Sequence, residues 1–251
     1  MADEPKAARD ASNWAKPVSE LRVGRDLPSD AVNLNVEGKR LSGLAGGFGK
    51  MWQKTYRVVL PAGAVTPTEL VRVWKERFPD FWPPGNRFYG PLTGIAPGEV
   101  AVLNLAAPAR TKLSTGIMVL YADEESFSFM NPEGHMFAGM ITFSAAEEDG
   151  VTAVQIQAMI RASDPMYEVA MALGGHRKED KFWHETLCNL AKAFGIADAE
   201  PTMKKVCVDR KRQWRYARNI RRNAAIRSGL YTMAAPVRLI AKPFKRRKQV
   251  A

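Results

Sequence analysis

Five β-rich segments joined by short connections restrict the fold more than any other feature of this sequence. The segments are residues 98–105, 114–121, 126–130, 134–143 and 151–160. Asp149-Gly150, between the last two, is a dipeptide preferred in two-residue β-hairpin turns. Parallel neighbours would need crossover connections of about a dozen residues or more. The pattern therefore predicts an antiparallel meander.

A strand and a helix are predicted before the meander. The strand covers the β-rich residues 54–60. Thr66 can cap the helix, Pro67 suits its first position and Glu69 can complete a capping box. This start signal predicts a helix over residues 66–78.

Two helices are predicted after the meander. Asp164 and Pro165 supply a cap and a first helical residue, and Gly174-Gly175 supplies an end. A longer helix is predicted over residues 176–194, because its apolar residues recur on one helical face. They are Trp183, Leu187, Leu190, Ala191 and Phe194.

The chain divides by charge into a mildly acidic body and a strongly basic tail. The whole chain has 251 residues, 46% hydrophobic and 25% charged, which excludes a wholly disordered protein. Residues 202–251 hold 16 Lys and Arg and one acid, Asp209, for a net charge of +15. The remainder has 21 bases and 25 acids, so its net charge is −4 and the total is +11. Any anionic partner is therefore expected at the tail.

The first 50 residues are predicted to be a flexible leader. They show little periodicity and end in a glycine-dense stretch, 43–49. The leader either drapes over the body, with Trp14 or Leu44 as anchors, or forms a mobile linker. The charged start of the chain lacks an apolar signal region, and Cys188 and Cys207 define no disulfide framework. We expect a cytoplasmic protein, peripheral to the inner face of the membrane if the tail binds lipid.

The order of strand, helix, antiparallel meander and long C-terminal helix resembles that of the START-like helix-grip superfamily. This superfamily contains polyketide cyclases, plant hormone receptors and lipid-transfer domains. Gly134-His135, then Gly139 and Phe143, preceded by residues 127–129, resemble a bacterial branch of it without an assigned function. The resemblance covers about residues 54–195 and leaves out the basic tail. It implies an α+β fold in which a curved antiparallel sheet wraps around the long C-terminal helix, here with a basic helical extension.

The resemblance divides the chain into three parts and implies a cavity between sheet and helix. The parts are the leader, 1–50, the helix-grip ligand-binding domain, 51–200, and the basic helical tail, 201–251. The cavity would hold a hydrophobic small molecule or lipid. Its predicted lining is Met118, Tyr121, Met130, His135, Phe137, Met140, Trp183 and Leu187. Met136, Met159 and Met166 belong to the same set of adaptable methionines, whose alternative role is ordinary core filling.

A second hypothesis is a cyclase- or hydrolase-type enzyme that uses the same cavity. His135 would be its acid or base, with Tyr121 beside it, although a histidine bonded within the turn is the favoured interpretation. No recognised catalytic constellation is present, so the sequence leaves enzymatic activity undecided. His176 and His184 have no Cys, Asp or Glu at ligand spacing, and we expect neither a metal nor a cofactor.

The tail favours anionic partners through a predicted helix over residues 210–227. Its candidate binding residues are Arg210, Lys211, Arg212, Trp214, Arg215, Arg218, Arg221 and Arg222. Three interpretations stay open: an anionic membrane surface, nucleic acid bound through its phosphates, or docking on the protein's own body. Arg161 is expected to pair with Asp164 or Glu168, or else to reach an anionic headgroup. The oligomeric state is not predicted.

Overall fold

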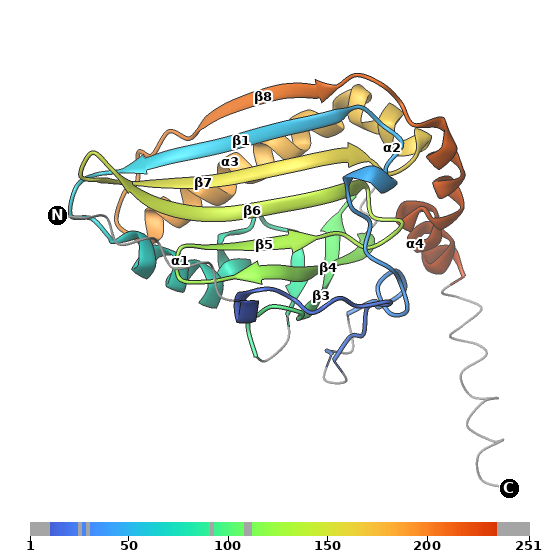
Figure 1. Ribbon diagram of the computed structural model, residues 1–251, viewed down its shortest axis with the longest axis horizontal. Coiled ribbons are helices and arrows are strands. Elements are labelled where there is room, and N and C mark those ends of the chain that lie inside the picture. The colour runs from blue at the N-terminus through green and yellow to red at the C-terminus, as the bar shows by residue number, and fades with distance from the viewer. Residues whose placement is uncertain (1–10, 25–26, 29–30, 91–92, 108–111, 235–251) are drawn as a thin grey trace, which may run out of the picture.

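One antiparallel sheet of eight strands forms the body of the computed structural model (Figure 1). The structure describes residues 11–24, 27–28, 31–90, 93–107 and 112–234. The strands are β1 (Met51–Leu60), β2 (Arg87–Tyr89), β3 (Val100–Ala106), β4 (Lys112–Ala122), β5 (Ser126–Met130), β6 (Phe137–Glu148), β7 (Val151–Ala162) and β8 (Thr202–Asp209). Their order in the sheet is β2-β3-β4-β5-β6-β7-β1-β8, so the predicted meander is confirmed.

Helices cover one face of this sheet, which we call the helix face. Figure 1 shows α1 and α3 behind the strands. The α-helices are α1 (Pro67–Glu76), α2 (Pro165–Ala170), α3 (His176–Ala193) and α4 (Ala224–Met233). Shorter helical segments are η1 (Ala11–Asn13), η2 (Leu44–Gly46), η3 (Phe78–Phe81), η5 (Met171–Gly175) and η6 (Trp214–Arg222). The antiparallel sheet with a long helix after it confirms the α+β class.

Local signals in the sequence account for where the elements begin. The Thr66 hydroxyl accepts from the Glu69 backbone at 3.3 Å at the start of α1, and the Asp164 carboxylate accepts from the Tyr167 backbone at 3.0 Å in α2. Asp149 and Gly150 both have positive φ, 49° and 79°, as the two-residue turn between β6 and β7 requires.

The leader crosses the other face of the sheet, which we call the outer face (Figure 1). Leu21 and Val36 are buried there against Val100, Val102 and Met118. Trp14, one of the two expected anchors, lies 4.7 Å from the Tyr121 ring and is 47% exposed, and Leu44, the other, is half-buried in η2. β3 is therefore buried on both faces, since Ala101 and Leu103 face the helices.

The tail begins differently from the prediction. Residues 202–209, assigned to the helical tail from sequence, form the edge strand β8 on β1. The single helix predicted over residues 210–227 is also wrong, because Asn223 has a non-helical ψ of 118° between η6 and α4. Its buried side chain accepts from the Ala225 backbone at 2.9 Å and donates to Asp164 at 2.8 Å, which fixes the break.

Candidate functional site

An apolar cavity of about 620 Å³ lies between the helix face of the sheet and the segment α2–η5–α3. From the sheet it is lined by Leu103, Leu105, Leu113, Ile117, Phe129, Ile141, Ala158 and Ile160. From the helical side it is lined by Met166, Tyr167, Ala170, Met171, Leu173, Phe182 and Trp183. This size and lining are typical of sites for small apolar ligands.

The cavity lies under the first half of α3 only. Lys178, Glu179 and Phe182 line it, whereas Leu187 and Leu190, further along the helix, are fully buried in the core. That core is filled by large aromatic residues, among them Trp74, Phe78, Phe127 and Phe143. The aromatic cluster thus closes one end of the space between sheet and helix, and the cavity occupies the other.

Three of the eight predicted lining residues, His135, Phe137 and Trp183, line this cavity. Their contact with a ligand stays a prediction. Leu187 does not line it, because it packs in the core. Tyr121 does not line it either, since it lies on the outer face against Trp14 and hydrogen-bonds Asp123.

The remaining predicted residues, Met118, Met130 and Met140, lie outside the cavity because the strand register places them on the outer face. Met118 pairs with Met130, Met130 with Met140 and Met140 with Met159 across four neighbouring strands. Residues directly opposite in an antiparallel pair project from the same face. The four methionines therefore form one row on the outer face, and placing three of them in the cavity was wrong. Met136 and Met166 do line it.

His135 is a buried polar residue of the cavity lining. Its Nδ1 accepts a hydrogen bond from the Phe137 backbone at 3.0 Å, as the turn interpretation expects. Burial lowers the pKa of the imidazole to about 4, so His135 is uncharged at neutral pH. With Tyr121 on the opposite face, the expected acid–base pair of His135 and Tyr121 does not exist.

Tyr167 is the tyrosine that the structure does bring to the cavity. Its hydroxyl accepts from the Ala225 backbone at 3.0 Å, and burial raises the pKa of the phenol. Tyr167 was not among the residues predicted from the sequence. The available signal was its position in the first turn of the helix that Asp164 and Pro165 start, because that turn covers the cavity.

A buried ionic network anchors the start of α3 to the sheet. The Lys54 ammonium, whose side chain is 0% exposed, lies 2.6 Å from Glu179 and 2.6 Å from Asp180. Asp180 also accepts from the Tyr56 hydroxyl at 2.7 Å. Glu179 lines the cavity, so the network helps set the height of the cavity under α3. Sequence alone gave no sign of it, because Lys54 stands at the start of a predicted strand.

The basic candidates of the tail are all exposed. The segment that carries them is nevertheless attached to the body by other side chains. Trp214 lies 5.2 Å from the Phe48 ring, and the Asn219 amide donates to Gly46 at 2.8 Å and to Ser163 at 2.9 Å. Two arginines also pair with the body, Arg212 with Glu168 at 3.0 Å and Arg222 with Glu133 at 3.0 Å.

The pairing predicted for Arg161, with Asp164 or Glu168, is wrong. The guanidinium of Arg161 binds Asp209 and the carbonyls of Gly49 and Lys211, the latter two at 2.7 and 3.0 Å. Asp164 binds Asn223 and Glu168 binds Arg212 instead. Asp209 can reach Arg161 because both residues are paired with Met51 of β1, from the two neighbouring strands. The arginine is buried by these contacts and does not face an anionic surface.

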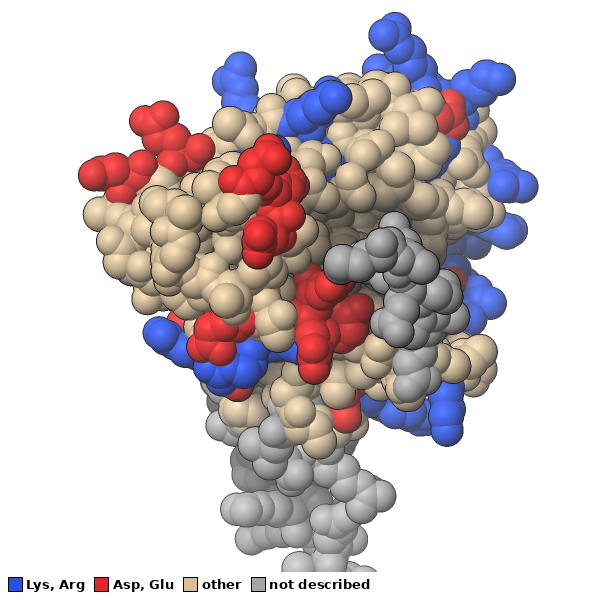
Figure 2. All heavy atoms as spheres, turned by 60° about the vertical axis from the view of Figure 1, so that its left-hand side comes forward, with Lys and Arg blue, Asp and Glu red and all other residues tan. Residues whose placement is uncertain are grey.

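Figure 2 shows several clusters of acidic side chains on the face of the molecule that it presents. Glu147, Glu148 and Asp149 are exposed at the β6–β7 hairpin. Among the described residues, no three His, Cys, Asp or Glu come together to hold a metal ion. In the same part of the chain, no helix combines the length and apolarity needed to cross a bilayer.

No protein-family model and no curated protein matches this chain. Solved structures that are similar to it include protein Ms6760 from Mycobacterium smegmatis, 14% identical with a TM-score of 0.42, over 57% of this chain and 90% of that one. Another is the di-domain ARO/CYC StfQ from the steffimycin biosynthetic pathway, 10% identical with a TM-score of 0.44, over 58% of this chain and 50% of that one.

A third is Ara h 8.0201, 10% identical with a TM-score of 0.41, over 57% of this chain and 97% of that one. Similarity this low says nothing of what the present chain binds or does. The fold described above rests on the strands, helices and register of the chain itself.

Proposed function

We propose that the protein binds a hydrophobic small molecule or lipid in the cavity between the sheet and α3, while its basic tail faces an anionic surface. The observation that carries the proposal is the apolar cavity of about 620 Å³. Interiors are normally packed without voids of this size, so an apolar space that persists in a folded protein favours an apolar guest. His135 and Tyr167 are polar groups within it that can orient the guest.

We place the entrance of the cavity on the side of the tail. Leu173 lines the cavity and is 82% exposed, and Val169 on α2 is 57% exposed. α2 and α4 lie at the same end of the molecule in Figure 1. Exposed apolar residues beside arginines suit a lipid surface, where each base near the headgroups contributes about 1 kcal/mol. The guest would enter and leave at this end.

We infer from Gly134-His135, Gly139 and Phe143 that the chain represents the bacterial branch of the START-like superfamily that these residues resemble. The branch has no assigned function, so the inference concerns descent and adds nothing about the ligand.

The cavity is tested by extraction and by filling it. Purified protein is extracted with organic solvent for mass spectrometry, and the delipidated protein is titrated with a fluorescent fatty acid. Ala158→Phe places a ring in the cavity and should reduce uptake at least tenfold, whereas Ala146→Phe, on an exposed stretch of β6, should leave it unchanged. The absence of both a co-purified apolar compound and measurable uptake would refute the proposal.

The tail is tested by vesicle flotation with phosphatidylcholine alone and with added phosphatidylserine. A variant in which glutamine replaces Arg210, Lys211 and Arg215 should lose binding to the acidic vesicles. All three residues are exposed, so the variant removes three positive charges from the surface. Retention of DNA or RNA without any vesicle binding would instead make nucleic acid the anionic partner and remove the membrane from the proposal.

A further inference from the structure

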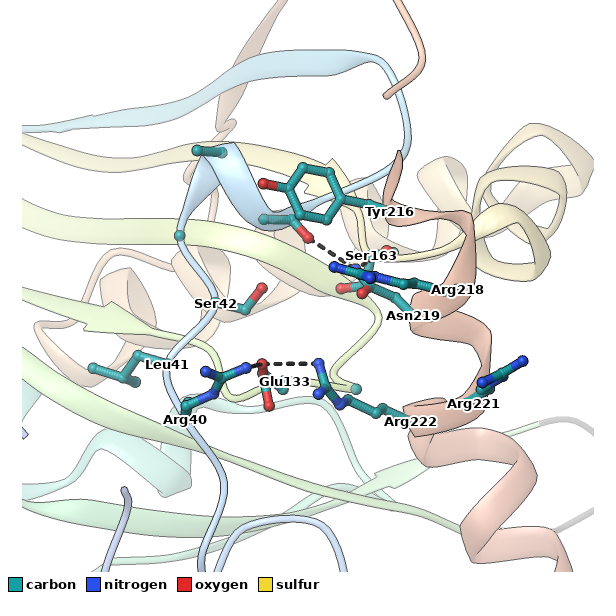
Figure 3. Close-up of a pocket in the computed structure, with 14 residues that line it drawn as sticks. Arg40, Leu41, Ser42, Glu133, Ser163, Tyr216, Arg218, Asn219, Arg221 and Arg222 are labelled. Carbon is teal, nitrogen blue, oxygen red and sulfur yellow. Dashed lines mark hydrogen bonds and ion pairs between the residues drawn. The ribbon is translucent and has the colours of Figure 1, made fainter. Parts of the chain in front are cut away.

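A second pocket, of about 610 Å³, lies where four parts of the chain that are distant in sequence meet (Figure 3). The leader contributes residues 40–43, 45 and 46, the turn before β6 contributes Glu133 and Gly134, the end of β7 is followed by Ser163, and η6 contributes residues between Tyr216 and Arg222. It shares no lining residue with the apolar cavity. Its lining includes three exposed arginines of the tail, Arg218, Arg221 and Arg222.

Guanidinium groups dominate this pocket. Arg40, Arg218, Arg221 and Arg222 line it together with a single carboxylate, Glu133, for a net charge of +3. Figure 3 shows Arg221 directed away from the rest, which leaves a net charge of +2 around the interior. The pocket therefore carries more positive charge than its own carboxylate balances.

The arginines inside the pocket differ in how they are held. Glu133 binds two of them, Arg40 at 2.8 Å and Arg222 at 3.0 Å, and so fixes both guanidinium groups. Arg218 forms no ion pair with any residue that the structure describes. In Figure 3 it extends from η6 toward Ser163 and Asn219. A fixed pair and an unpaired third guanidinium thus surround one space.

Ser163 supplies an independent sign of a ligand. It lines the pocket and is 2% exposed, yet its hydroxyl has no hydrogen-bond partner among the described residues. A buried hydroxyl left unpaired is unfavourable, and native structures leave few of them. A polar ligand atom in the pocket would supply the missing partner.

We propose that this pocket binds a phosphomonoester dianion. Arginine forks match phosphate oxygens and bind them in bidentate fashion. A dianion balances the interior charge of +2, whereas a carboxylate or a phosphodiester carries only one negative charge. The inference rests on the proposed function, since it names the group that the basic surface recognises. The group belongs either to a lipid headgroup such as that of phosphatidic acid or to a soluble phosphate ester.

Titration calorimetry with glycerol 3-phosphate tests the pocket. Arg218→Gln should weaken binding about tenfold or more, as the loss of a hydrogen bond to a charged group implies. Lys204→Gln is the matched control, because it removes one positive charge from an exposed position of the tail that lies outside the pocket and outside the proposed surface-binding residues. Equal losses in the two variants, or no binding by the unmodified protein, would overturn the proposal in favour of a diffuse basic surface.

Ser163→Ala provides a second variant that should not disturb folding, because the hydroxyl it removes is unpaired. Weaker binding with an unchanged or higher melting temperature supports the proposal. Unchanged binding by both Ser163→Ala and Arg218→Gln contradicts it.

Vesicles distinguish the two sources of the phosphate. A preference for phosphatidic acid over phosphatidylserine at matched surface charge, lost in Arg218→Gln, identifies a lipid headgroup. Binding of glycerol 3-phosphate without that preference identifies a soluble ester, and both results support the pocket's chemistry. Fatty-acid uptake by Arg218→Gln should stay normal. A protein that binds glycerol 3-phosphate but takes up no apolar ligand would refute the proposed function and leave this inference standing.

Discussion

At the scale of single residues, burial shifts the pKa of His135 in a way that affects folding at acidic pH. Its Nδ1 is an acceptor for the Phe137 backbone, and its pKa of about 4 keeps the ring neutral inside the cavity. In the unfolded chain the imidazole has a pKa of about 6.5. The unfolded state therefore binds more protons than the folded state between these two values, and stability falls as the pH is lowered through that range.

We predict that His135→Asn removes part of the acid sensitivity of folding. Asn can keep the acceptor near the Nδ1 position but does not titrate. Lowering the pH from 7.5 to 5 should cost the unmodified protein about 2 kcal/mol more than the variant. Urea denaturation at both pH values measures the difference. His184→Asn, at an exposed histidine, should behave like the unmodified protein; an identical pH dependence in all three proteins would disprove the assignment to His135.

The glycines of the Gly134–Phe143 stretch are explained by backbone geometry. Gly139 has a φ of 141°, and a Cβ there would lie 2.1 Å from the Met159 carbonyl oxygen on β7. A Cβ on Gly134, where φ is 90°, would lie 2.1 Å from the Arg222 carbonyl oxygen. Phe127 and Phe143 stack in the core, and Phe129 packs against Phe143 at a tilt. The residues of the family resemblance thus serve the fold, which is why they reveal little about chemistry.

We predict that Gly139→Ala destabilises the protein by about 2–4 kcal/mol, because the methyl group must displace the backbone of β7. Gly229→Ala is the matched control: it lies within α4 with no atom close to its added Cβ, and should stabilise by about 0.5–1 kcal/mol. Thermal and urea denaturation check both. If the two substitutions have similar effects, the close approach at Gly139 is not what requires glycine.

At the scale of elements, the sequence predicted what depends on local chemistry. The turn at Asp149-Gly150, the caps Thr66 and Asp164, and the meander follow from neighbouring residues. β8 was missed because its basic residues resemble the rest of the tail, and its pairing with β1 joins segments far apart in sequence.

The candidate site was predictable only in part, because register decides which face a strand residue occupies. Met130 and its neighbour Phe129 differ by one position, yet Phe129 lines the cavity and Met130 lies on the outer face. The composition indicated an apolar lining, but it did not indicate which alternate residues of each strand face the cavity. The ionic network of Lys54 could not be predicted either, because its partners on α3 lie more than 120 residues away in the sequence.

We predict that Lys54→Met destabilises the protein by about 3–5 kcal/mol, because it leaves the carboxylates of Glu179 and Asp180 without their buried partner. Replacing the whole set, Lys54→Met with Glu179→Gln and Asp180→Asn, should restore much of that loss, since a neutral group of similar shape needs no ionic partner. Urea denaturation of the single and triple variants makes the comparison. A triple variant as unstable as the single one would show that packing of Lys54, and not its charge, holds α3.

At the scale of the whole molecule, the described part of the basic tail, residues 202–234, is structurally part of the body. After β8, the chain supplies partners for polar groups that are buried elsewhere: Asn223 binds Asp164 at 2.8 Å, and Arg227 binds Asn35 in the leader at 2.8 Å. Ser228 is likewise buried against Ser114 on β4. These residues of the tail therefore connect leader, sheet and α2, and the exposed arginines of η6 are held at fixed positions relative to the cavity.

A chain that ends at Asp209 should consequently unfold at a clearly lower temperature than the full protein. Its truncation leaves Asp164 and Asn35 without the partners named above, and each unpaired buried group costs about 1–3 kcal/mol. Hydrogen exchange should show lost protection in the leader around Asn35 as well as at the start of α2, because both ends of these contacts are freed. Truncation would leave the melting temperature unchanged if the tail were an independent appendage, and in that case its arginines would have no fixed relation to the cavity.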